Sequence, residues 1–263
     1  MRILCLHDDG QNENILKSEL APLLSNLQQS NLTLAFEFLN GPLQCLGSPK
    51  GDSSELYRYK FFEVEEVGDI RKAGDWLVRK LDHDGPYDGI LAISQGAAVV
   101  SSFLLYRQWY DHELPAPFRF AIFINGGIPL KILKDLGVPV SNEAVNVVAE
   151  AKLQRERGLD PLPAHITKAR RAVFNSDDCF GLNLNKIPLE LKIRIPTVHV
   201  WGGNNPLFST SVQLTGLCDP YIRKIQVHKG SHEIPRDEEE LSELVSLIEW
   251  CIQRATWPGQ AQI

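Results

Sequence analysis

Residues 89–98 read "GILAISQGAA" and contain the transition on which the fold depends. The apolar run 89–94 predicts a buried strand, and the sequence that follows, 95–109, has the pattern of a helix. Ser94 stands at the junction. A serine on such a turn has its hydroxyl exposed at the carboxyl edge of a parallel sheet, where a nucleophile can reach substrate. Serine is equally common as the cap of a helix, and this stretch alone does not separate the two interpretations.

The residues beside Ser94 fit a sharp turn between strand and helix. Ala92 and Gly96 are both small, as the close approach of the two backbones requires. The same turn directs the backbone N–H of Gln95 toward the place where an oxyanion would form. The pattern A-x-S-x-G is short enough to arise by chance, so its position at a strand–helix junction carries more weight than its letters.

Strand-like and helix-like segments alternate along the chain and predict an α/β fold with a doubly wound, mostly parallel sheet. We expect one domain over residues 1–263, with functional groups at the carboxyl ends of the strands. The predicted strands are 2–7, 32–39, 89–94, 120–125, 197–202 and 222–228. The predicted helices are 13–29, 67–82, 95–109, 209–217 and 237–256.

Two segments interrupt this alternation. Residues 40–62 are rich in Gly, Pro and Ser, and residues 127–190 carry helical patches between proline-bearing turns. Insertions without a strand often form lids or pocket walls, so we expect a helical lid-like insertion at about 127–190. A solvated excursion from the fold is an equally good interpretation of both segments.

Composition excludes several classes of function. There are 27 Lys and Arg against 33 Asp and Glu, with no basic stripe, so we expect no nucleic-acid partner. No apolar stretch approaches the roughly 20 residues of a membrane span. The five cysteines are scattered and form no CxxC pair, which predicts neither a metal site nor disulfides and favours a reducing, cytoplasmic location. We expect no cofactor.

A serine hydroxyl is a poor nucleophile unless a base accepts its proton. His232 lies in "HKGSHEIP", a loop between the last predicted strand and the last helix. In hydrolases of the α/β class the histidine comes last in chain order, and His232 fits that position. The loop "LHDDGQN" (6–12) follows the first strand, and Asp9 or a neighbour there could present a second N–H to an oxyanion.

Several motifs in register resemble the fungal FSH-type family of serine hydrolases, which have the α/β-hydrolase fold. They are "LHDDGQN", "FLNGPL", "GPYDGILAISQGAA", "IPTVHVWGGNNPLF" and "HKGSHEIP". The resemblance implies Ser94 as nucleophile, His232 as base, and the backbone N–H groups of Gln95 and Asp9 as oxyanion donors. It also implies ester or thioester hydrolysis of a small-molecule acyl or polyketide-like chain in fungal secondary metabolism, and it allows a carrier protein of a synthase as a partner.

Three positions depart from the family pattern. Asp8 stands where the first loop usually has glycine, Ala92 replaces the first glycine of the turn, and Asn205 occupies the slot of the acid. An acid orients the histidine and stabilises the imidazolium that forms, and asparagine does neither well. If the Asp8 carboxylate faced the pocket while ionised, it would oppose a developing oxyanion.

Three interpretations follow. In the first, another carboxylate replaces the missing acid and hydrolysis survives; the candidates are Asp177, Asp178, Asp219 and Asp8. In the second, His232 and Asp8 perform acid–base chemistry without an acyl-enzyme, as in a cyclase, isomerase or lyase. In the third, the chain is a catalytically inactive binding protein, because a fold does not settle function by itself.

Overall fold

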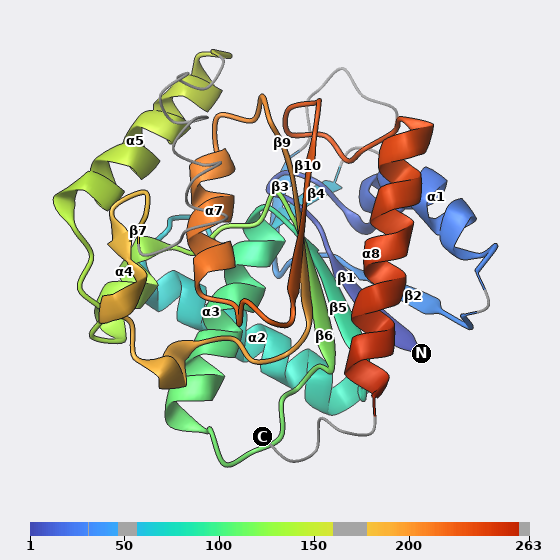
Figure 1. Cartoon of the computed structure of the whole chain (residues 1–263), viewed down its shortest axis with the longest axis horizontal. Coiled ribbons are helices and arrows are strands. Elements are labelled where there is room, and N and C mark those ends of the chain that lie inside the picture. The colour runs from blue at the N-terminus through green and yellow to red at the C-terminus, as the bar shows by residue number, and fades with distance from the viewer. Residues whose placement is uncertain (31, 47–56, 160–177, 258–263) are drawn as a thin grey trace.

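Six short apolar segments form one sheet in which every pairing is parallel (Figure 1). In sheet order they are β10 (Arg223–His228), β9 (Thr197–Gly202), β6 (Phe120–Ile124), β5 (Gly89–Ile93), β1 (Arg2–Leu6) and β2 (Ala35–Leu39). The structure is a computed structural model that describes residues 1–30, 32–46, 57–159 and 178–257. Strand order runs outward in both directions from the β1–β5 pair, which makes that pair the topological switch point.

Helices cover both faces of the sheet (Figure 1). Two amphipathic helices, α1 (Glu13–Leu27) and α8 (Glu238–Thr256), pack on one face. The other face is covered by α2 (Val67–Asp84), α3 (Gln95–Tyr110) and α7 (Phe208–Gly216). Because both faces are covered, the central strands are apolar along their whole length.

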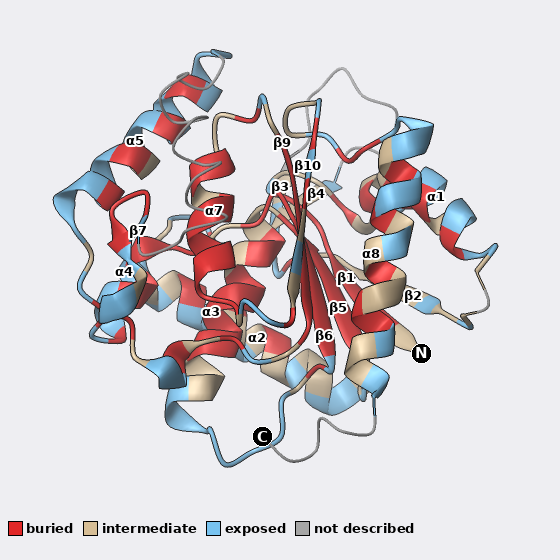
Figure 2. Cartoon of the chain, viewed as in Figure 1, coloured by how far each residue is buried: buried red, intermediate tan, exposed pale blue. Residues whose placement is uncertain are grey.

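Alternate residues of each strand point to opposite faces and divide the core in two. In β1, Leu4 and Leu6 belong to the core beneath α2 and α3, whereas Ile3 and Cys5 belong to the core beneath α1 and α8. Figure 2 shows the buried central strands between helices whose outer surfaces are exposed. This double burial fixes the register of the strands, and hence the height at which each one ends.

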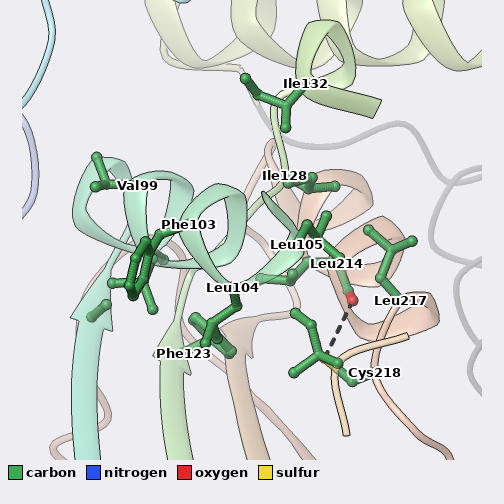
Figure 3. Packing of buried hydrophobic residues seen from close by; sticks show 14 of the residues in the cluster. Val99, Phe103, Leu104, Leu105, Phe123, Ile128, Ile132, Leu214, Leu217 and Cys218 are labelled. Carbon is green, nitrogen blue, oxygen red and sulfur yellow. Dashed lines mark hydrogen bonds between the residues drawn. The ribbon is translucent and has the colours of Figure 1, made fainter. Parts of the chain in front are cut away.

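The helix that follows β5, α3, is buried along most of its first three turns. Figure 3 shows side chains of α3 packed against Phe123 of β6 and Leu214 of α7. Val99 and Leu105 are completely buried within α3. This packing holds the start of α3, and with it Ser94, rigidly over the end of β5.

The two interrupting segments contain their own small elements. In the first, β3 (Leu43–Leu46) and β4 (Tyr57–Lys60) form an antiparallel hairpin. In the second, the chain leaves the sheet after β6 and returns at β9. That stretch holds α4 (Leu130–Asp135), α5 (Asn142–Glu156), β7 (Asp178–Cys179), β8 (Leu182–Asn183) and two 3-10 turns, η2 (Leu184–Lys186) and η3 (Leu189–Leu191). Part of the expected insertion, 160–177, lies outside the described residues.

The predicted α/β-hydrolase architecture is confirmed, and all six predicted strands and five predicted helices are present. The hairpin of β3 and β4 was not predicted, because its strands are short and its apolar residues do not alternate regularly. None of the helices in the described part of the chain has both the length and the apolar character to cross a membrane. All five cysteines are free thiols.

The turn at Ser94 requires glycine at position 96, and this requirement predicts a measurable loss of stability. A Cβ at Gly96 would lie 2.8 Å from the His7 carbonyl oxygen and 2.9 Å from Leu6 Cβ. We expect Gly96→Ala to lower the free energy of unfolding by about 1–3 kcal/mol, measured by urea denaturation, because β1 and α3 must move apart. The matched control is Gly74→Ala in α2, where a Cβ meets open space. The control is expected to gain up to about 1 kcal/mol, and an equal gain for Gly96→Ala would contradict this account.

Candidate active site

The carboxyl ends of five strands place the candidate residues in one group. The loop after β1 carries Asp8, and β5 ends at Ser94. Asn125 follows β6, Asn205 follows β9 and His232 follows β10. The strands are parallel, so these loops lie at the same edge of the sheet, beside the switch point between β1 and β5.

Ser94 has the backbone of a nucleophile turn. Its φ of 46° and ψ of −103° place it in a region that non-glycine residues rarely occupy. Such strain clusters at functional sites and persists because the surroundings over-determine it. Within the described residues, the Ser94 side chain makes no capping hydrogen bond to α3, and its hydroxyl lies near enough to the Asp8 carboxylate to help lower the pKa of that group. The interpretation of Ser94 as a helix cap therefore does not fit its geometry.

Two backbone N–H groups beside Ser94 converge on one oxygen atom. The Asp9 N–H donates to Asp8 Oδ1 over 2.7 Å, and the Gln95 N–H donates to the same oxygen over 3.3 Å. Two N–H groups directed at one point, next to a nucleophile turn, have the geometry of an oxyanion hole. The Asp8 carboxylate fills that position in this structure.

Buried contacts fix the loop that carries these donors. The Gly41 N–H donates to His7 Nε2 over 2.9 Å, so that nitrogen must accept and Nδ1 must carry the proton. His7 Nδ1 then donates to the Asp8 carbonyl oxygen over 2.6 Å. Burial lowers the pKa of His7, which keeps the ring neutral. On the other side, the Gly10 N–H donates to the Tyr59 carbonyl oxygen over 3.0 Å and ties the loop to β4.

The second oxygen of Asp8 meets two basic side chains. His232 Nε2 lies 3.1 Å from Asp8 Oδ2, and Arg155 Nη2 lies 3.3 Å from the same oxygen. Burial alone would raise the pKa of Asp8, but its hydrogen bonds, including the one with His232, and the positive charge of Arg155 outweigh burial. The pKa of Asp8 therefore lies well below its ordinary value, and the group is an ionised carboxylate and a weak base.

Asn205, at the position where the family pattern has an acid, contacts Nδ1, the other ring nitrogen of His232. Asn205 is completely buried, and its Nδ2 lies 3.1 Å from His232 Nδ1 and 2.9 Å from Asn125 Oδ1. Asn205 Oδ1 accepts the N–H of Leu207 over 3.0 Å. Asn125 Nδ2 in turn donates to the His232 carbonyl oxygen over 2.6 Å. His232 is thus held between an amide on one side and the Asp8 carboxylate on the other.

The other candidate carboxylates and histidines lie in different settings. Asp219 accepts the N–H of Tyr221 in the turn before β10, and Asp178 is an exposed residue of β7. Asp177 lies outside the described residues. His199 is a buried core residue of β9 whose Nε2 lies 3.1 Å from Thr197 Oγ1.

A cavity of about 510 Å³ opens beside Ser94. Its apolar walls include Phe62, Ile128, Pro129, Val148 and Leu207. Its charged residues include Glu65, Lys152 and Arg155, and Lys152 pairs with Glu65 over 2.7 Å. Across the described residues, no three His, Cys, Asp or Glu side chains are grouped as a metal ion would require. The shape and lining suit an organic ligand with an apolar chain.

Two residues of the site were not predicted from the sequence. Asn125 follows directly after β6, the strand next to β5, so the rule that parallel strands end at one edge could have identified it. Its φ of 49° is a second sign of a specialised position. Arg155 lies near the end of α5, many residues along the chain from any predicted strand, and no sequence signal places it at the site.

Comparisons with known proteins find relatives along nearly the whole chain. Esterase alnB from Emericella nidulans is 27% identical over 97% of each chain, and hydrolase FUB4 from Fusarium oxysporum is 26% identical over 94% of this chain and 97% of its own. Among solved structures, a variant of SOBER1 from Arabidopsis thaliana superposes with a TM-score of 0.51 at 16% identity, covering 96% of this chain and 99% of its own. That likeness shows the fold. The sequence model described as "Serine hydrolase (FSH1)" matches residues 1–244, and the chain therefore belongs to this family.

Proposed function

We propose that this chain hydrolyses an ester or thioester through an acyl-enzyme on Ser94, with His232 as the base. The observation that carries the proposal is the pair of N–H groups of Asp9 and Gln95, 2.7 and 3.3 Å from one oxygen position beside Ser94. Two convergent donors beside a strained serine turn are placed to hold a developing oxyanion. Membership of a serine hydrolase family supports the same reaction.

The reaction follows from the positions of these groups. Ser94 Oγ attacks the carbonyl carbon and gives up its proton to His232, while the N–H groups of Asp9 and Gln95 hold the oxyanion. The proton then passes to the leaving alcohol or thiol, and an acyl-enzyme remains on Ser94. Water, deprotonated by His232, attacks the acyl carbon. The bond from that carbon to Ser94 Oγ then breaks, His232 returns the proton to Oγ, and the acid is released. The Asp8 carboxylate must leave the oxyanion hole first, because a substrate carbonyl oxygen occupies the same place.

The cavity supports an acyl chain as the substrate class. Its volume of about 510 Å³ and its walls at Phe62, Ile128 and Leu207 fit an apolar chain of moderate size. Val148 and Arg155 of α5 also line it, so this part of the insertion serves as a pocket wall. We infer a polyketide-like acyl chain, free or borne by a synthase carrier protein, from the family resemblance together with this lining.

A second candidate is acid–base chemistry without an acyl-enzyme, such as cyclisation, isomerisation or elimination. One observation favours it: His232 contacts a carboxylate at Nε2, the nitrogen that would have to receive the Ser94 proton, and an amide at Nδ1. The Asp8 carboxylate would need to lose several of its donors to become an effective base, since its pKa lies below the ordinary value. This requirement places hydrolysis first.

A fluorophosphonate probe tests for an activated nucleophile at Ser94. We expect the wild-type chain to be labelled, and Ser94→Ala to lose both the label and the turnover of p-nitrophenyl esters. Mass spectrometry of the labelled peptide locates the adduct. The matched control is Ser246→Ala, an exposed serine of α8, which should label like the wild type. Labelling that survives in Ser94→Ala would remove the acyl-enzyme, and a wild-type chain that never labels would favour the second candidate.

Asn205→Asp tests the missing acid. An aspartate there would accept a hydrogen bond from His232 Nδ1–H and stabilise the imidazolium, leaving Nε2 free to receive the Ser94 proton. The opposite change in a serine protease costs about 10⁴-fold in turnover, so we expect kcat/KM on p-nitrophenyl butyrate to rise at least about tenfold. A flat rate in a folded variant would show that position 205 does not limit the reaction.

Asp8→Gly tests the occupant of the oxyanion hole. Glycine removes the carboxylate and leaves the N–H groups of Asp9 and Gln95 open to substrate. An oxyanion-hole donor is worth about 10²–10³-fold in kcat, so we expect a clear gain in p-nitrophenyl butyrate hydrolysis and a larger gain when Asn205→Asp is added. If the folded single variant is no faster than wild type, the Asp8 carboxylate does not obstruct this hole.

A further inference from the structure

We propose that Asn125 and Asn205 form a positioning pair that holds the resting proton of His232 on Nε2, the nitrogen opposite to the one a serine hydrolase protonates at rest. The inference rests on the proposed function in one respect, because it concerns the base that Ser94 needs.

Two backbone groups fix the orientation of the two side-chain amides. The Leu207 N–H can only donate, so the Asn205 atom 3.0 Å away from it must be the acceptor Oδ1. The His232 carbonyl oxygen can only accept, so the Asn125 atom 2.6 Å away from it must be the donor Nδ2. If the Asn205 amide were turned over, two donors would face each other at Leu207; if the Asn125 amide were turned over, two acceptors would face each other at His232.

The remaining atoms of the pair then determine the histidine. Asn205 Nδ2 carries two protons and faces two atoms: Asn125 Oδ1 at 2.9 Å and His232 Nδ1 at 3.1 Å. One N–H of Asn205 donates to Asn125 and the other donates to His232. His232 Nδ1 is therefore an acceptor and bears no proton. A neutral imidazole with a bare Nδ1 carries its proton on Nε2, which donates to Asp8 Oδ2 over 3.1 Å.

Burial makes this arrangement hard to reverse. Asn205 is 0% exposed and Asn125 is 3% exposed, so water cannot replace a lost partner. Turning both amides over would keep the bond between them but would lose those to Leu207 and His232. Buried donors and acceptors without partners carry a full desolvation penalty, so the observed orientation is strongly preferred.

The consequence for catalysis is that the resting proton of His232 lies on the nitrogen that would have to accept the Ser94 proton. With an aspartate at position 205, Nδ1 would hold the proton and Nε2 would be free to accept one from Ser94. In this chain Nε2 is already protonated and faces the Asp8 carboxylate. His232 can act as a base only after its proton moves to Nδ1, where it would meet the Asn205 NH₂ group. Asn125 thus acts on the reaction through Asn205 and is a positioning residue.

Nitrogen NMR reads the tautomer directly. The full-length chain labelled with ¹⁵N-histidine, held near pH 8, gives two ring-nitrogen signals per histidine, and a protonated nitrogen is far upfield of a bare one. His232→Gln identifies the signals of this residue. We expect the protonated shift at Nε2 and the bare shift at Nδ1. Asn205→Asp should exchange the two, and Asn125→Gly, which tolerates the positive φ, should move both shifts toward intermediate values.

The control and the contrary results are equally specific. Asn204→Asp adds the same charge one residue away, where the Asn204 amide donates to the Lys229 carbonyl oxygen, and should leave the His232 signals unchanged. A protonated Nδ1 in the wild type, alone or in an imidazolium, would overturn the proposal. Unchanged signals in a folded Asn125→Gly variant would overturn the role of the pair. The NMR measurement uses no substrate and no probe, so a failure of phosphonate labelling at Ser94 would leave this inference standing. A contrary tautomer at His232 would likewise leave the proposed acyl-enzyme on Ser94 standing.

Discussion

A buried carboxylate must be given hydrogen-bond donors, and at the centre of this site the carboxylate of Asp8 takes them from the groups to which we assign catalytic roles. The N–H groups of Asp9 and Gln95, the ring of His232 and the guanidinium of Arg155 all contact it. In the proposed reaction, the two N–H groups would hold a substrate oxygen and His232 would transfer a proton. The resting site is therefore organised around an internal anion that resembles a bound carboxylic acid product.

The scaffold and the residues that distinguish this chain act at different levels. The parallel sheet, the strained turn at Ser94 and the close approach at Gly96 belong to the serine hydrolase architecture and need nothing beyond packing to form. Asp8 and Asn205 change the electrostatics on that scaffold, one at each nitrogen of His232. A reaction that uses Ser94 must displace the Asp8 carboxylate and must proceed without the acid that Asn205 replaces. We therefore predict a hydrolase that is restrained until substrate enters.

The sequence predicted the sheet well because the apolar runs of buried parallel strands and the periodicity of their helices are strong local signals. Family membership, expected from motifs in register, is confirmed by a match over residues 1–244. Ser94, His232 and Asn205 could be predicted to lie at one edge of the sheet because each comes at or after the end of a predicted strand. The direction of the Asp8 side chain could not be predicted, since it depends on partners 87 to 224 residues away. Arg155 was missed for the same reason, and the catalytic roles are still predictions.

The most direct test is a crystal structure of the chain after reaction with a small fluorophosphonate. The account predicts phosphorus bonded to Ser94 Oγ and a phosphonyl oxygen between the N–H groups of Asp9 and Gln95, at the position that Asp8 Oδ1 now occupies. The Asp8 side chain should have turned away from that point. An adduct whose phosphonyl oxygen lies elsewhere while Asp8 still receives both N–H groups would contradict the assignment of this position as the oxyanion hole.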